Sequence, residues 1–81
     1  MQLNVLFFAQ ARERAGVAQA RVTVPDGARV ADALDAIVAA HPALAPLRAH
    51  LAVAQDGAIV RAAEPLRDGA ELALLPPVSG G

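Results

Sequence analysis

The stretch VADALDAIVAA, residues 30 to 40, decides the fold of this chain. Its larger apolar side chains recur at the spacing of one helix face: Val30, Leu34, Ile37 and Val38. Asp32 falls in the first turn, where a negative charge suits the helix dipole. His41 and Pro42 end the pattern, because the residue before a proline is disfavoured in helical conformation. The sequence therefore predicts one main amphipathic helix with a single apolar stripe to bury.

Two strand patterns precede this helix. Residues 3–8, LNVLFF, and residues 19–24, QARVTV, are rich in β-branched, aromatic and other apolar residues. Residues 9–15 between them predict a short helix that Gly16 ends, since glycine readily takes the left-handed conformation of a helix C-terminus. We expect the two strands to form a hairpin with this short helix in the connection.

Three further strands follow the main helix. Residues 51–54 and 58–61 flank Gln55-Asp56-Gly57, and Asp-Gly between apolar runs is a strong hairpin signal. Residues 71–75, ELALL, predict the last strand after a turn at Asp68-Gly69. The segment 42–50 is expected to be a loop with about one turn of helix.

This order of elements predicts the fold class. One main helix can cover only one face of a sheet, so the chain is expected to form an α+β domain of two layers. The arrangement matches the β-grasp, or ubiquitin-like, fold, with a mixed sheet of about five strands packed on the helix. We expect the domain to span residues 1–75 and an extended C-terminal tail to span residues 76–81.

Composition excludes several classes of function. The chain has 81 residues and a net charge of −1, and its seven cationic side chains are all scattered arginines, so nucleic acid is not an expected partner. No apolar run reaches the length of a membrane span and no basic leader opens the chain, which favours a cytoplasmic protein. Without cysteine there is no thiolate nucleophile or cysteine metal site. Without lysine the chain cannot form isopeptide-linked chains on itself.

The segment PPVSGG, residues 76–81, carries the chemistry that we expect. Pro76 and Pro77 favour an extended backbone, and six extended residues reach about 20 Å. Gly80 and Gly81 have no side chains, so their backbone fits a slot too narrow for other residues. A terminal carboxylate must be activated before it reacts, commonly as an acyl-adenylate. No phosphate-binding loop is present in this chain, so ATP must be bound by a partner.

Three motifs resemble one known family. Phe7-Phe8-Ala9 followed by Arg12-Glu13, the turn Asp68-Gly69-x-Glu71, and the ending LLPPVSGG look like the MoaD family, the small subunits of molybdopterin synthase. The resemblance covers the whole chain, and the ending is its most specific part. The family often has aromatic residues at the end of the last strand, where this chain has Leu74 and Leu75.

The resemblance implies a mechanism and a set of partners. In that family an E1-like adenylyltransferase, using ATP and magnesium, activates the terminal carboxylate, here that of Gly81, which a sulfur donor enzyme converts to a thiocarboxylate. The tail then enters the large subunit of a heterotetrameric synthase, where sulfur passes to cyclic pyranopterin monophosphate. The chain itself would be a non-catalytic sulfur-carrying subunit that binds no cofactor and no metal.

A partner surface is predicted beside the tail. Alternation along the strands places Leu6 and Phe8 on the sheet face opposite the core, and Leu75 likewise. In a two-layer fold that face is open, and exposed apolar residues next to a functional tail are typical of a docking surface. The residues predicted to contact partners are Pro76, Pro77, Val78, Ser79, Gly80, Leu75, Phe8, Leu6, Ile59 and Arg12. For Leu6 and Phe8 the alternative is that the short helix covers them.

Other functions share this chemistry. A sulfur carrier for thiamin, cysteine or tRNA thiolation would use the same tail, and so would a ubiquitin-like modifier that is joined to lysines of target proteins. A plain interaction domain would not need Gly81 at all. His41 and His50 lack the spacing of a metal site, so we expect structural or solvated roles for both.

Overall fold

The computed structural model describes residues 1–77 and contains eight elements of secondary structure. In chain order they are β1 (Gln2–Phe7), α1 (Ala9–Ala15), β2 (Gln19–Thr23), α2 (Val30–Ala40), the 3-10 helix η1 (Pro42–His50), β3 (Ala52–Gln55), β4 (Ala58–Val60) and β5 (Glu71–Leu75). This is the predicted β-grasp arrangement, and the positions of both α-helices agree with the sequence prediction.

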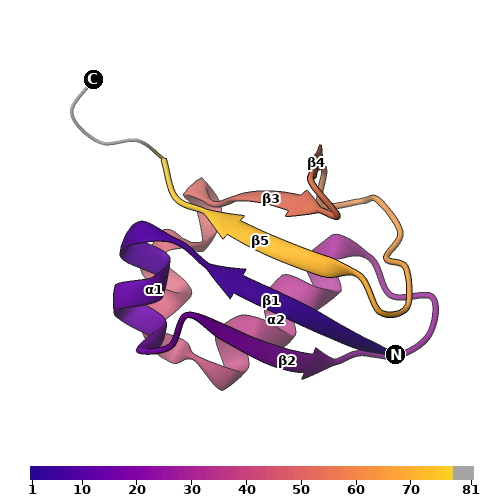
Figure 1. Ribbon diagram of the computed structural model, residues 1–81, viewed down its shortest axis with the longest axis horizontal. Coiled ribbons are helices and arrows are strands. Elements are labelled where there is room, and N and C mark those ends of the chain that lie inside the picture. Colours follow the sequence, from indigo (N-terminus) through magenta and orange to yellow (C-terminus); the bar gives the residue numbers. More distant parts are fainter. Residues whose placement is uncertain (78–81) are drawn as a thin grey trace.

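The five strands form one mixed sheet in the order β2-β1-β5-β3-β4 (Figure 1). The first and last strands of the chain, β1 and β5, lie parallel at the centre, and the other neighbouring pairs are antiparallel. The register pairs Leu6 with Ala73 across β1 and β5. It also pairs Ala73 with Ala54 and Ala52 with Leu75 across β5 and β3.

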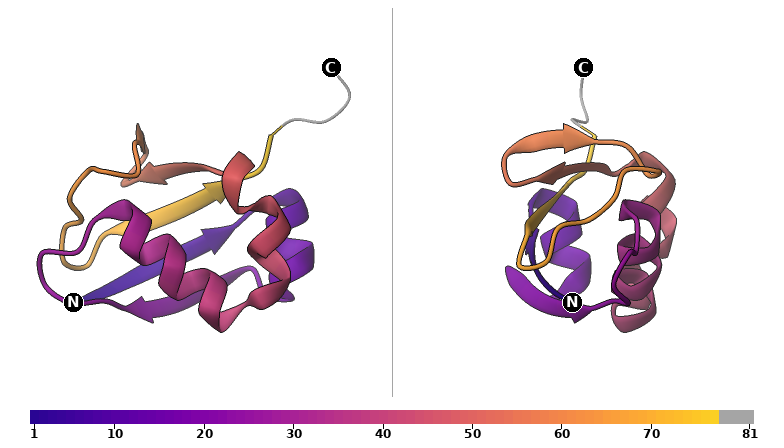
Figure 2. Two further views of the ribbon diagram at one scale, coloured as in Figure 1. Left: turned by 180° about the vertical axis from the view of Figure 1, so that it is seen from behind. Right: turned by 90° about the vertical axis from the view of Figure 1, so that its right-hand side faces the viewer.

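The core lies between the sheet and the helices α2 and η1, which cover one face only (Figure 2). Helix α2 buries the predicted stripe at Val30, Leu34 and Ile37, while Val38 is partly buried. The inward residues of the central strands complete the core: Leu3, Val5, Phe7, Leu72, Leu74 and Val53. The small α1 packs on η1 at the end of the sheet where β1 and β5 finish, with Ala11 fully buried.

Two local predictions differ from the structure. Residues 42–50 form a 3-10 helix throughout rather than a loop with one turn, because Leu44 is fully buried and draws the segment against α1 and α2. Gln55 belongs to β3 rather than to the turn, which contains only Asp56 and Gly57. Both turn residues have positive φ (48° and 89°), as a tight two-residue hairpin requires.

Candidate functional site

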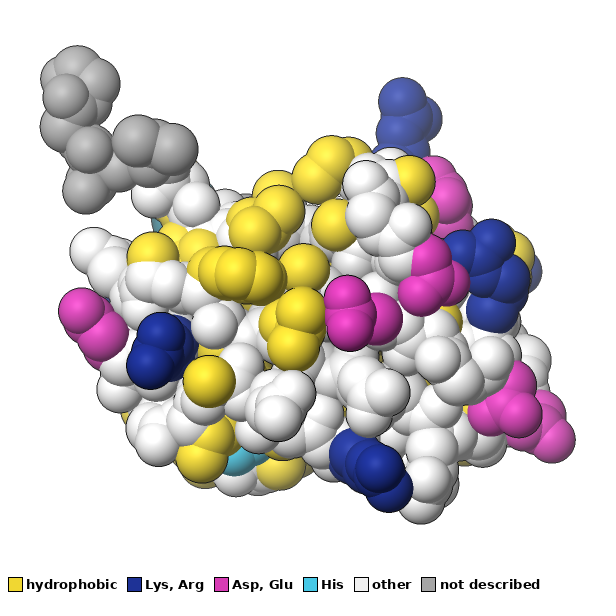
Figure 3. Space-filling view, viewed as in Figure 1, with side chains coloured by type: hydrophobic (Ala, Val, Ile, Leu, Met, Phe, Trp, Pro, Cys, Tyr) yellow, Lys and Arg dark blue, Asp and Glu magenta, His cyan; other side chains and the backbone are white. Residues whose placement is uncertain are grey.

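Within residues 1–77 one face of the sheet carries no helix, and an apolar patch occupies part of it. Paired residues on neighbouring strands point to the same face, so the register assembles the patch directly. It consists of Leu6, Phe8, Ala52, Ala54, Ile59, Ala73 and Leu75. Figure 3 shows hydrophobic side chains gathered on this face, and none of the seven belongs to the core cluster.

The patch contains the large apolar side chains that are exposed on the sheet. Phe8 is 44% exposed and Ile59 is 67% exposed, whereas Leu6 and Leu75 are half-buried among their neighbours. Helix α1 therefore does not cover Phe8, although Phe8 immediately precedes it. The structure brings Leu6, Phe8 and Leu75 together on one face, as the alternation predicted, and the register adds Ile59 to them. Contact of these residues with a partner stays a prediction.

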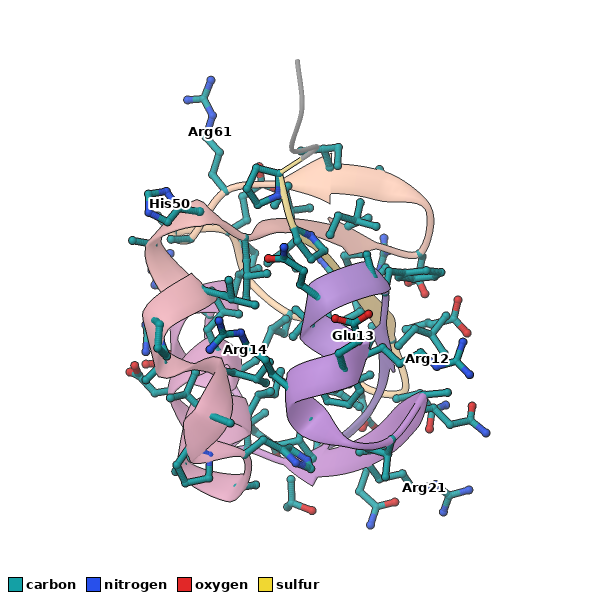
Figure 4. The ribbon with its side chains drawn as sticks, turned by 90° about the vertical axis from the view of Figure 1, so that its left-hand side faces the viewer. Arg12, Glu13, Arg14, Arg21, His50 and Arg61 are labelled. Atoms are coloured by element: carbon teal, nitrogen blue, oxygen red, sulfur yellow. The ribbon has the colours of Figure 1, made fainter. Side chains whose placement is uncertain are left out.

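Arg12 lies on α1, next to this face. It is exposed and lines a surface hollow of about 520 Å³ between α1 and the start of β2, together with Glu13, Gly16 and Val17. Figure 4 shows Arg12 and Arg21 pointing outward on the side of the molecule away from α2. Arg14 points toward η1 instead, where it donates a long hydrogen bond to the Ala43 carbonyl (3.5 Å).

The base of the predicted tail is the end of the central strand. Pro76 is half-buried and Pro77 is exposed, directly after Leu75 of the patch. The remaining predicted tail residues, Val78, Ser79, Gly80 and Gly81, lie outside the described residues. The patch is thus continuous along β5 with the segment that leads to Gly81.

A row of polar side chains on the same face was missed by sequence reasoning. Asn4 pairs with Arg21 on β2 and with Glu71 on β5, so the three residues form a row across three strands. The row borders the patch, because Leu6 and Ala73 come two residues later on β1 and β5. Alternation signals that Asn4 shares a face with Leu6, but only the register places Arg21 and Glu71 on either side of it.

The start of β5 is fixed by the β3–β4 turn. The Asp56 carboxylate accepts hydrogen bonds from the Glu71 backbone N–H (2.9 Å) and from the Arg67 guanidinium (2.6 Å). These two contacts, the first above all, hold the pKa of Asp56 below its usual value. The side chain of Gln55, 6% exposed, bonds the Pro65 carbonyl and the Arg67 N–H. Asp56 therefore positions the strand that leads to the tail, and Gln55 positions the loop that precedes it.

Comparison with known proteins assigns the family. The ThiS family model matches residues 5–81 of this chain. The chain belongs to the ThiS/MoaD family of ubiquitin-like sulfur carriers. This carrier is 45% identical over 83 residues to the molybdopterin synthase sulfur carrier subunit of Chlamydomonas reinhardtii, with all of both chains covered.

Another relative of this sulfur carrier is named a modifier. Small archaeal modifier protein 1 of Haloferax volcanii is 45% identical over 82 residues, which cover 91% of this chain and 94% of the relative. The crystal structure of SAMP1 from that organism superposes with a TM-score of 0.92 at 40% identity, over all of both chains. One chain of the complex of subunits 1 and 2 of the molybdopterin-converting factor from Helicobacter pylori superposes on this chain with a TM-score of 0.70 at 27% identity. All of this chain and all of that chain are covered.

Residues 1–77 contain no cluster of three or more side chains arranged to hold a metal ion. Within the same residues no helix has the length and apolar character needed to cross a membrane. What the described part of the carrier presents is a surface, formed by the patch and the polar row beside the base of the tail.

Proposed function

We propose that this chain is the sulfur carrier subunit of a molybdopterin synthase, with the carboxylate of Gly81 as the sulfur-bearing group. The observation that carries the proposal is full-length similarity, at 45% identity, to a subunit of that name. The chain's Pro-Pro-Val-Ser-Gly-Gly ending supports it, since a stiff stem with a bare tip suits entry into a partner's active site.

The chemistry proceeds on the tail while the folded body acts as its handle. An E1-like partner joins the Gly81 carboxylate to the adenylyl group of ATP and releases pyrophosphate. Sulfur supplied by a donor enzyme at the oxidation level of sulfide then attacks the acyl-adenylate carbonyl, AMP leaves, and a thiocarboxylate remains, a nucleophile that needs no cysteine in the carrier. In the large subunit the thiocarboxylate sulfur bonds to cyclic pyranopterin monophosphate, and water cleaves the acyl–sulfur bond, so that the sulfur stays on the substrate and the terminal carboxylate is regenerated.

The apolar patch supports the docking half of this proposal. Exposed apolar residues that line one face beside the tail suit a protein partner, whose binding would remove them from water. The related complex of subunits 1 and 2 from Helicobacter pylori makes the large subunit the first partner to test. Pro76 and Pro77 would enter the partner's channel ahead of the four residues that end the chain.

The test has two measurements. Incubation with an E1-like enzyme from the same genome, ATP, magnesium and a sulfur donor should increase the intact mass by the difference between sulfur and oxygen. The thiocarboxylate form, mixed with the large subunit and cyclic pyranopterin monophosphate, should then yield molybdopterin. A variant that lacks Gly81 should do neither. Unchanged cofactor production in cells that carry this deletion would refute the proposal.

A modifier function is the second candidate, because the relative from Haloferax volcanii is named a modifier and is also 45% identical. Modifier activity would join Gly81 to lysines of other proteins, and it predicts a ladder of heavier conjugates on immunoblots of cell extracts. A carrier for thiamin, cysteine or tRNA thiolation would give the mass increase but no stable complex with the large subunit. The conjugate ladder and the complex with the large subunit together separate the three candidates.

A further inference from the structure

The polar row formed by Arg21, Asn4 and Glu71 has a composition that suits the recognition of another molecule. It lies in a hollow of about 370 Å³ lined by these three residues with Gln19 and Ala20. One end of the row carries a cation, the other an anion, and an amide able to donate and accept lies between them. The hollow therefore offers complementary partners for two opposite charges.

Neither charge has a structural role within the described residues. In residues 1–77 the Arg21 guanidinium and the Glu71 carboxylate form no ion pair, and no hydrogen bond reaches either group. Arg48 pairs with Asp35 and Arg67 with Asp56, whereas the side chains of Arg12, Glu13 and Asp68 resemble the ends of the row in forming no ion pair within residues 1–77. The two ends of the row are thus free to pair with groups of another molecule.

The row lies at the far end of the patch from the tail. Along β5 the order is Glu71 in the row, Ala73 and Leu75 in the patch, and then the prolines. Leu75 lies four residue steps beyond Glu71 along the strand, a distance of about 13 Å. A partner that covers the patch would therefore contact the row and the tail at two separate places, with the patch between them.

This distance matters because apolar contact is non-directional. A partner held by the patch alone would leave the carrier free to rotate. With an extended tail of about 20 Å, a rotation of roughly 30° would move the tip by about 10 Å. A second, polar contact remote from the tail removes this freedom and fixes where the terminal group arrives.

We infer that the Arg21–Asn4–Glu71 row orients the carrier on the partner that covers the patch, by pairing Arg21 with an acidic side chain and Glu71 with a basic side chain of that protein. The inference rests on the proposed function, which supplies the partner. Two strand spacings separate the two charges, so the complementary groups on the partner should lie about 10 Å apart. Arg21 and Glu71 are positioning residues, since neither touches the reacting atoms.

The experiment uses the full chain and the large subunit from the same genome. The variants are Arg21→Glu, Glu71→Arg and the double swap that carries both changes. Arg21→Gln and Glu71→Gln remove each charge without reversing it, and urea unfolding checks that every variant is folded. Ala39→Glu and Ala39→Arg place the same charges on the exposed surface of α2 and serve as matched controls. Titration calorimetry gives Kd, and single-turnover assays of the thiocarboxylate form give the transfer rate at saturating large subunit.

We expect each reversal to weaken the complex about tenfold and the double swap about a hundredfold, while the Ala39 controls bind like wild type. Transfer at saturation should slow as well, which a purely structural change would not produce. If the two charges instead served only each other across Asn4, the double swap would restore wild-type binding, and this result would overturn the inference. Wild-type binding by all variants would overturn it too. Failure of the wild-type chain itself to bind would refute the proposed function first.

Discussion

Part of the Phe8 side chain packs on the carrier and part is exposed for a partner to cover. Phe8→Ala should therefore weaken binding to the large subunit and also lower the free energy of unfolding. A phenylalanine side chain presents about 200 Å², and 44% of Phe8, about 90 Å², is open to solvent in the free carrier. At about 25 cal/mol per Å², covering that area contributes about 2.2 kcal/mol to a complex, or roughly 40-fold in Kd. The remaining area, about 110 Å², already packs on the carrier, so its loss lowers the free energy of unfolding by at most about 3 kcal/mol.

Titration calorimetry with the large subunit and urea unfolding of the free carrier measure these two quantities separately. Val17→Ala is the matched control, because Val17 is 42% exposed but lies outside the patch, and its binding should stay at the wild-type level. If Phe8→Ala lost unfolding free energy yet bound the large subunit within about threefold of wild type, the patch would not be the docking surface. Equal weakening by Val17→Ala would refute the assignment of the effect to this face.

Three further substitutions test the body of the carrier. Gln55→Leu leaves the Pro65 carbonyl and the Arg67 N–H without their partner, so urea unfolding should show a loss of about 2 kcal/mol. Ala9→Gly relieves a positive φ of 49° and should raise the free energy of unfolding by about 0.5 kcal/mol, measured the same way. The lowered pKa of Asp56 means that its carboxylate stabilises the fold fully above the ordinary value of 3.8 and loses this effect as pH falls through the lower folded value. Asp56→Asn should therefore flatten the dependence of unfolding free energy on pH below about 4, whereas an unchanged slope would contradict the assignment.

The fold was predictable because its signals are local. The stripe of α2 repeats at the helical period, and Gly16 ends α1 with a φ of 78°, as its position after the short helix predicts. Asp56-Gly57 forms the expected two-residue turn. The 3-10 helix at residues 42–50 escaped prediction, because its cause is the burial of Leu44 against two other helices and not a periodic pattern of its own.

The candidate site was predictable only in part, because alternation within a strand is a local signal and pairing between strands is not. Alternation within a strand assigns a face, and so it placed Leu6, Phe8 and Leu75 opposite the core. It does not say which residue of a neighbouring strand lies alongside. The row of Arg21, Asn4 and Glu71 depends on pairings of residues that are distant in the sequence, so it emerges only from the register. The same holds for Gln55, whose burial depends on the loop that folds back over its side chain.

The central position of β5 explains how a small domain can serve as a handle for a reactive terminus. The strand pairs with β1 on one side and β3 on the other, and it buries Leu72 and Leu74 in the core. Its opposite face contributes Glu71 to the row and Ala73 and Leu75 to the patch. A single strand thus joins the core, the proposed orienting contact, the proposed docking surface and the base of the tail. Since a strand paired on both sides opens only with its neighbours, the element nearest the proposed sulfur-bearing group is one that the fold holds firmly.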